Sequence, residues 1–187
     1  MGACTAVLSK LGQRPALALS RMGDDALAEA LHGFRYRFFD AGDLVPLLAA
    51  VRDLRSRFGS LESAFLSVDD AAEPDYSGTA SRLVGLLAAV APAAWRSNLL
   101  PDPARGSAAK RTFLYLRWMV RRDAVDPGPW TRADPSRLLV PLDTHMAAAC
   151  RRLGILVRRG TDLAAVREAT AAFRAIGPTI PSATISA

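Results

Sequence analysis

Residues 107–122, SAAKRTFLYLRWMVRR, decide the fold of this chain. Apolar side chains recur there at helical spacing, and the last turn is basic, as suits the carboxyl end of a helix. The stretches on either side have the same periodicity. The sequence therefore predicts an all-α protein.

Working outward from this segment, the other expected helices cover residues 24–33, 44–58, 60–67, 77–95, 143–153 and 161–176, with Asp43 as the cap of the second. Proline-bearing loops are expected at 69–76, 98–106 and 123–137, the last with one turn of helix at Pro135. No segment shows the sustained polar–apolar alternation of a strand. We expect a single compact helical domain over residues 1–176.

The charge of the chain favours a polyanionic partner. Its 24 basic residues outnumber the 18 acidic ones, which gives a formal net charge of +6 and a pI near 10.1. Lysine is rare among these basic residues, and the two lysines are Lys10 and Lys110. No apolar run approaches the roughly 20 residues of a membrane span, and the first residues lack the pattern of a signal peptide. We expect a cytoplasmic protein without a membrane segment.

The sequence implies no metal and no cofactor. Cys4, Cys150, His32 and His145 are too few for a cysteine-rich zinc site or an iron–sulfur cluster. Asp143 and His145 could each ligate a metal ion, but no third ligand stands near them in the sequence.

Residues 140–154, VPLDTHMAAACRRLG, contain the most specific signal in the chain. Asp143 follows Pro141 and stands at the start of an expected helix, where capping is the ordinary role of an aspartate. His145 is expected near the same helix start, which it would orient by a hydrogen bond. A catalytic role for Asp143 is the second interpretation, and it rests on a resemblance described below.

Lys110 lies in the first turns of the helix expected at 107–122. The helix macrodipole disfavours an ammonium group there, and burial would favour the neutral amine that a Schiff-base nucleophile needs. The alternative is an exposed side chain beside Arg111. The Ser107-x-x-Lys110 spacing also occurs in penicillin-binding enzymes, but their companion Ser-Asp-Asn and Lys-Thr-Gly motifs are absent.

Basic residues surround these two candidates and are suited to contacts with nucleic-acid phosphates. In the alternative interpretation, Arg121 and Arg122 cap the end of their helix and one arginine pairs with Asp123 or Asp126. Trp118 and Trp130 are expected in the core. The candidate nucleic-acid-binding residues are Arg105, Arg111, Arg117, Arg121, Arg122, His145 and Arg151.

Several motifs together resemble an uncharacterised bacterial family of unknown function, over residues 7–176. That family is similar to the helix-hairpin-helix DNA glycosylases, above all to their archaeal 8-oxoguanine branch, in which the lysine also lies far before the aspartate. The motifs are Lys110-Arg111, Leu116–Arg121, Asp126–Gly128 with Trp130, Pro135-Ser136, Pro141–His145, FRYRF at 34–38 and GSLESAF at 59–65.

The resemblance implies a DNA base-excision glycosylase, with Schiff-base lyase activity as an option and DNA as the partner. Asp143 would stabilise the oxocarbenium-like sugar or activate the nucleophile, and Lys110 would attack the sugar carbon. The apolar-Pro-Gly-apolar-Gly hairpin that grips DNA in the superfamily is missing, and Gly106-Ser107 stands in its place. The alternatives are a non-catalytic nucleic-acid-binding protein and a helical interaction module on the same scaffold.

Residues 177–187, GPTIPSATISA, lack helical periodicity. In the family, Pro-Val-Arg/Lys-Tyr-Asp-Phe leads into a further helix at this point. Codons for Thr179–Ser186 read one base earlier permit Asp-His-Pro-Val-Arg-Tyr-Asp-Phe. We therefore expect a disordered, out-of-frame tail. Because Met1–Lys10 also resembles the middle of a family helix, we expect a chain truncated at both ends.

Overall fold

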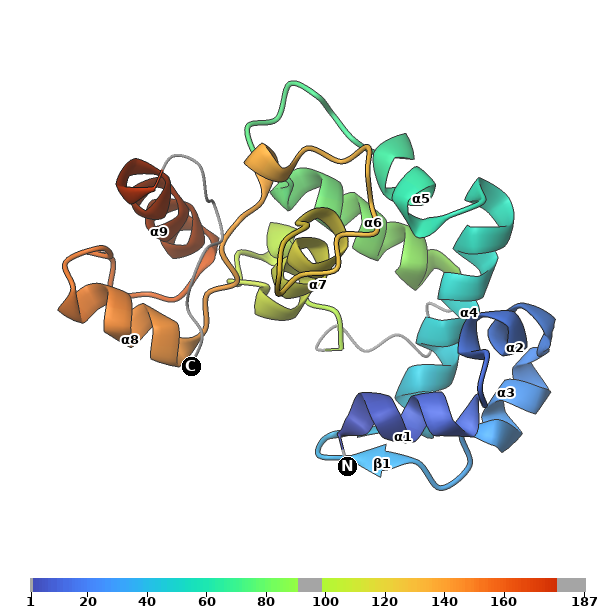
Figure 1. Ribbon diagram of the computed structural model, residues 1–187. Coiled ribbons are helices and arrows are strands. Elements are labelled where there is room, and N and C mark those ends of the chain that lie inside the picture. Colours follow the sequence, from blue (N-terminus) through green and yellow to red (C-terminus); the bar gives the residue numbers. More distant parts are fainter. Residues whose placement is uncertain (1, 91–98, 178–187) are drawn as a thin grey trace. The chain divides into compact units, whose positions relative to one another are not determined.

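The computed structural model describes residues 2–90 and 99–177, and it confirms the all-α prediction (Figure 1). The α-helices of the described residues are α1 (Ala3–Lys10), α2 (Pro15–Arg21), α3 (Asp24–Ala30), α4 (Ala41–Phe58), α5 (Leu61–Ser67), α6 (Ser77–Val90), α7 (Lys110–Val120), α8 (Thr144–Arg152) and α9 (Leu163–Ile176). Two short 3-10 helices, η1 (Pro103–Arg105) and η2 (Pro135–Arg137), lie in the loops. Among residues 2–90 and 99–177, no helix combines the length and the apolar character that crossing a bilayer requires.

The chain divides into two compact units. Unit 1 comprises Met1–Ala64 and Gly85–Leu99, and unit 2 comprises Phe65–Val84 and Leu100–Ala187. Helix α6 belongs to both, because the boundary falls between Val84 and Gly85. A single domain over residues 1–176 stays a prediction. The expected end of the α6 helix at residue 95 and the tail from residue 178 onward lie outside the described residues.

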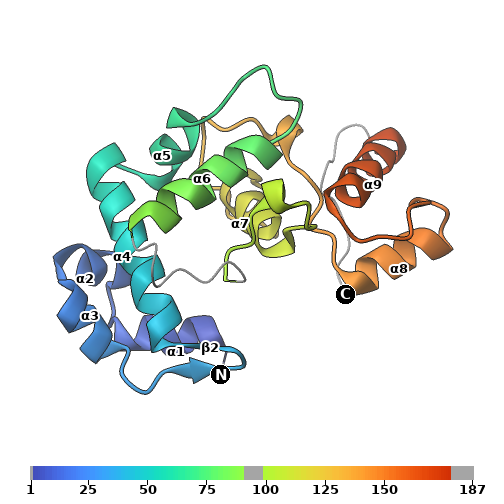
Figure 2. The same cartoon turned by 180° about the vertical axis from the view of Figure 1, so that it is seen from behind.

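In unit 1, helices α2 and α3 pack against α4 (Figure 2). Leu11, Leu19, Leu27 and Leu31 form the centre of the core there, and apolar side chains of α4 cover them. The N-cap of α4 is Asp40 and not Asp43, which corrects the expected helix start. Asp43 instead occupies the third helical position and completes a capping box by accepting the Asp40 N–H at 3.0 Å.

A small β-hairpin precedes α4. Strands β1 (Arg35–Tyr36) and β2 (Phe39–Asp40) pair antiparallel, with Arg35 opposite Asp40 and Tyr36 opposite Phe39. Arg37 and Phe38 form the two-residue tip. Strands of two residues are too short for the alternation that would reveal them in a sequence, so sequence analysis missed this hairpin.

The core of unit 2 lies around α7. Phe113 and Leu116 on α7 are buried, and Phe65 packs against Tyr76 and Trp130 with ring centroids 5.0 and 5.2 Å apart. Trp130 is buried as expected. Trp118 is 46% exposed, so its placement in the core was wrong.

Helix α7 begins at Lys110, three residues later than its sequence pattern predicts. Ala109 precedes it with a φ of 40°, a left-handed conformation that interrupts the helix at this point. The segment 123–137 is irregular and contains one turn of helix at Pro135, as expected.

The carboxyl end of α7 is closed by the segment that follows it. The Gly128 N–H donates to the Trp118 carbonyl at 3.1 Å, and the Trp130 N–H donates to the Met119 carbonyl at 2.8 Å. These bonds satisfy carbonyls that have no partner inside the helix. The motif Asp126–Gly128 with Trp130 therefore has a structural role at the end of α7.

Candidate functional site

Lys110 and Asp143 meet in unit 2. The ammonium Nζ of Lys110 donates to Oδ2 of Asp143 at 2.7 Å, although the two residues are 33 positions apart. Lys110 is the first residue of α7, and Asp143 is the N-cap of α8. Their side chains are 44% and 33% exposed, so a ligand from solvent has access to both. The structure thus brings together the two residues that the sequence singled out.

The geometry of Asp143 confirms its interpretation as a helix cap, and its catalytic role stays a prediction. Its Oδ1 accepts the Met146 N–H at 2.7 Å and so caps α8, as an aspartate with extended backbone does at a helix start. Its Oδ2 is left for Lys110. The cap therefore fixes the carboxylate in the orientation in which it contacts the amine.

The segment before Lys110 is attached to the start of α9. The Leu163 N–H donates to the Gly106 carbonyl at 3.0 Å, and the backbones of Ser107 and Asp162 pair in an antiparallel β-bridge. Asp162 caps α9 by accepting the Ala165 N–H at 2.8 Å. The position of Lys110 thus depends on a contact between two distant parts of unit 2. Sequence analysis missed this attachment, and the only local signal was the Gly106-Ser107 pair before the helix.

The electrostatics favour an ionised Asp143. The hydrogen bond from Lys110 has the largest effect and lowers the pKa of Asp143 below its ordinary value of 3.8, and the Met146 N–H lowers it further. Partial burial raises the pKa by less. The carboxylate is therefore anionic at neutral pH.

The side chains of Arg117, Arg121 and Arg151, which are candidate phosphate-binding residues, are held by partners inside unit 2. The Arg117 Nε donates to Oδ2 of Asp126 at 2.8 Å, and Arg121 lies 3.4 Å from the same oxygen and also pairs with Asp123. Asp126 is buried. The Arg151 guanidinium donates to the carbonyls of Arg158, Arg159 and Gly160, each at 2.8 Å, and so holds the loop between α8 and α9.

The other candidates are exposed. Arg105 lies 4.0 Å from Asp102, and Arg111 follows Lys110 on α7. The backbone of Arg122 pairs with that of Pro127 in an antiparallel β-bridge just after α7. His145 lies in the first turn of α8, and its ring makes no hydrogen bond with the described part of the chain, so the expected hydrogen bond is not observed. Whether any of these residues contacts nucleic acid stays a prediction.

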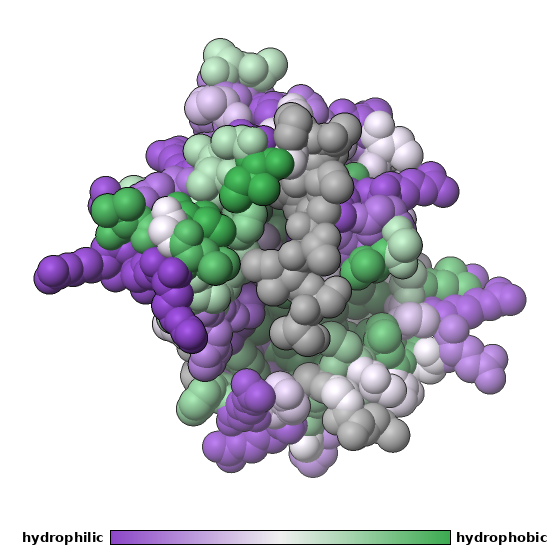
Figure 3. All heavy atoms as spheres, turned by 60° about the vertical axis from the view of Figure 1, so that its left-hand side comes forward, coloured by the Kyte–Doolittle hydropathy of each residue, from purple (hydrophilic) through white to green (hydrophobic). Residues whose placement is uncertain are grey.

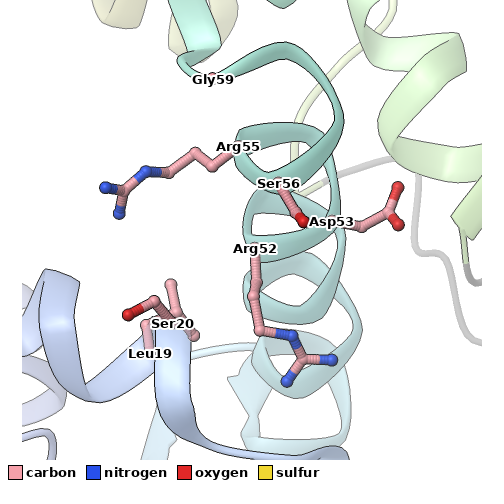
Figure 4. A pocket seen from close by; sticks show the side chains of 7 residues that line it. All are labelled: Leu19, Ser20, Arg52, Asp53, Arg55, Ser56 and Gly59. Carbon is pink, nitrogen blue, oxygen red and sulfur yellow. The ribbon is translucent and has the colours of Figure 1, made fainter.

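A separate hollow of about 470 Å³ lies in unit 1, lined in part by Arg52, Asp53 and Arg55 of α4 (Figure 4). Arg55 and Asp53 point to opposite sides of the helix. The Arg52 guanidinium is held by the Met22 carbonyl and the Asp24 carboxylate. The polar groups of this hollow do not converge, and none of the candidate residues lines it.

The surface of the described part of the chain carries several exposed apolar side chains. In unit 2 they include Leu153, Val157 and Ile176. Hydrophobic and hydrophilic side chains both reach the face displayed in Figure 3. Within residues 2–90 and 99–177, no group of three or more His, Cys, Asp or Glu side chains is placed to hold a metal ion.

Comparison with protein-family models identifies a family for this chain. A family model described as "Protein of unknown function (DUF2400)" matches residues 1–183. No curated protein and no solved structure matches the chain.

Proposed function

We propose that this chain, which belongs to the DUF2400 family of proteins of unknown function, is a DNA base-excision glycosylase. The proposed activity uses Lys110 and Asp143. The observation that carries the proposal is the 2.7 Å contact between Lys110 Nζ and Asp143 Oδ2. An amine and a carboxylate that are held together and reachable from solvent are the two groups that excision through a Schiff base requires. The resemblance of the motifs to helix-hairpin-helix glycosylases supports the same assignment.

Asp143 supplies negative charge where positive charge develops on the sugar. Cleavage of the bond between sugar and base passes through an oxocarbenium-like state, as in other glycosidic cleavages. A carboxylate that is already ionised and fixed by a helix cap stabilises this state without having to reorganise. The lowered pKa of Asp143 keeps it in this form at neutral pH.

Lys110 supplies the nucleophile. In the proposed step, the bond between sugar C1′ and the base nitrogen breaks, and its electron pair leaves with the base. The Lys110 ammonium gives one proton to the leaving base, and the lone pair of the resulting amine forms the new bond to C1′. Opening of the C1′–O4′ bond, with transfer of a second proton from nitrogen to the ring oxygen, gives a protonated imine. The damaged base must be turned out of the helix stack to reach these groups.

Borohydride trapping tests the proposal, because borohydride reduces the imine to a stable amine that links protein and DNA. We expect the wild-type chain to form this link with a duplex containing the right damaged base, in a screen that includes 8-oxoguanine and uracil. Lys110→Gln should abolish the link. Lys10→Gln is the matched control, since Lys10 Nζ donates to the His32 carbonyl in unit 1, and it should leave trapping unchanged.

Mass mapping of the trapped peptide identifies the attacking amine directly. A link at Lys110 supports the proposal, whereas a link at Lys10 or at the amino terminus contradicts it. No link with any damaged base, together with DNA binding that weakens as salt rises, would favour the non-catalytic nucleic-acid-binding protein.

A further inference from the structure

The β-hairpin of unit 1 exposes an aromatic ring that no part of the fold explains. Phe38 at its tip is 82% exposed, and Tyr36 on the preceding strand is 40% exposed. Phe34, at the base of the same FRYRF motif, is buried. The motif therefore anchors the hairpin at one end and presents aromatic side chains to solvent at the other.

The hairpin tip is also strained. Arg37, the first of the two tip residues, has a φ of 54°, a left-handed conformation that favours glycine. Hairpins with two-residue tips usually place Gly, Asn or Asp at such positions. An arginine there costs stability, and backbone strain of this kind is a reason to look for a function.

The charge around Phe38 is positive. Arg35 and Arg37 are exposed, and the Arg37 guanidinium lies 5.6 Å from the centroid of the Tyr36 ring. Among the described residues, no carboxylate pairs with either arginine. Asp40, the nearest acidic residue in the hairpin, is engaged in the capping box of α4. The hairpin thus carries an exposed aromatic ring and an arginine at its tip and a second arginine on β1.

We propose that this hairpin tip is a DNA contact, at which Phe38 stacks on a base and Arg35 and Arg37 bind the neighbouring phosphates. Stacking of bases on aromatic side chains next to basic residues is a general mode of nucleic-acid binding, and apolar side chains inserted between base pairs unstack them. Because Phe38 is 82% exposed, its ring is accessible to a base. The inference rests on the proposed function for the identity of the partner.

The experiment uses the full chain and a duplex that contains one 2-aminopurine, whose fluorescence rises when it is unstacked. We expect wild type to raise this fluorescence on binding. Phe38→Ala should remove the rise and weaken binding about tenfold, the range of a lost base–aromatic stack. Phe38→Tyr keeps a ring and should retain the rise. Leu17→Ala, on α2 of the same unit and 39% exposed, is the control and should behave as wild type.

Folding does not confound the comparison, because a side chain that is 82% exposed contributes little to the core, and equal melting temperatures of wild type and Phe38→Ala check this. Equal fluorescence and affinity for wild type and Phe38→Ala would overturn the inference, as would absence of DNA binding by the wild type. If trapping at Lys110 persists while Phe38→Ala behaves as wild type, only the hairpin inference fails. If the fluorescence depends on Phe38 and no imine forms with any damaged base, only the proposed function fails.

Discussion

At the scale of single residues, the Asp143 carboxylate makes two contacts, and different substitutions remove them separately. Asp143 uses Oδ1 to cap α8 and Oδ2 to contact Lys110. Asparagine is as good a helix cap as aspartate but carries no charge. The ion pair with Lys110 is partly exposed, and such pairs contribute at most about 1 kcal/mol. Stability and catalysis should therefore respond differently to the same change.

We expect Asp143→Asn to change the free energy of unfolding by less than about 1 kcal/mol while it suppresses base excision. Asp143→Ala should lose the cap as well and be less stable than Asp143→Asn by about 1 kcal/mol. Urea denaturation and single-turnover excision assays measure the two effects. Full activity of Asp143→Asn would show that the charge of Asp143 is not used.

The pH dependence of stability follows from the same residue. Folding lowers the pKa of Asp143 below 3.8, so its ionised form stabilises the fold at pH values above that, and the contribution is lost as pH falls through the folded-state value. The difference in unfolding free energy between wild type and Asp143→Asn should stay constant from about pH 5 to pH 8 and shrink in stronger acid. Denaturation series at several pH values check this. If the difference in unfolding free energy between the two proteins changed near neutral pH, a group other than Asp143 would be titrating.

At the scale of elements, the end of α7 depends on a close approach of backbones. Gly128 has a φ of 46°, and a Cβ atom there would lie 2.6 Å from the Arg121 carbonyl oxygen. A side chain at this position therefore forces the 126–130 segment away from α7 and breaks its hydrogen bonds with Trp118 and Met119.

We expect Gly128→Ala to lower the free energy of unfolding by about 1 to 3 kcal/mol, because strain and lost hydrogen bonds act together. Gly85→Ala is the matched control. A Cβ atom at Gly85 meets nothing within 4 Å, and alanine inside a helix is more favourable than glycine, so this variant should be slightly more stable than wild type. Similar stability of Gly128→Ala and wild type would contradict the close packing of this segment.

At the scale of the whole molecule, the net charge of +6 favours a polyanionic partner, and binding to such a partner would weaken as salt rises. We expect the DNA affinity of the wild type to fall steeply as salt rises, and Arg111→Ala to reduce the slope of log affinity against log salt by about 1. Anisotropy titrations of labelled duplexes at several salt concentrations measure the slope. Affinity that does not change with salt would favour the helical interaction module.

The choice of arginine matters for this experiment. Arg117→Ala would leave the buried carboxylate of Asp126 with a weaker set of partners, and loss of a partner from a buried pair costs about 3 to 5 kcal/mol in other proteins. A loss of DNA binding by Arg117→Ala could then result from unfolding as well as from a lost phosphate contact. Arg57→Ala on α4 of unit 1 is the control, because Arg57 is exposed and pairs with Asp53 of its own helix.

The sequence by itself determined the helical character of the chain, and it singled out Lys110 and Asp143 as candidate site residues. Helical periodicity is a local property, so the stretches around α3, α7, α8 and α9 could be identified without knowledge of their neighbours. Asp143 could be placed at a helix start for the same reason. Helix starts were less certain, as Ala109 and Asp40 show, because caps depend on backbone angles that several residue types adopt.

Only the tertiary structure decided which charges meet. The sequence marks Arg117, Arg121 and Arg151 as candidates for phosphate contacts, and the fold places each of them against a partner inside unit 2. The physical reason is that an ion pair forms where the folded chain brings two distant side chains within a few ångströms, and sequence spacing does not encode that distance. The 2.7 Å contact between Lys110 and Asp143 has the same origin. It arises because the packing of unit 2 brings the start of α7 to the start of α8.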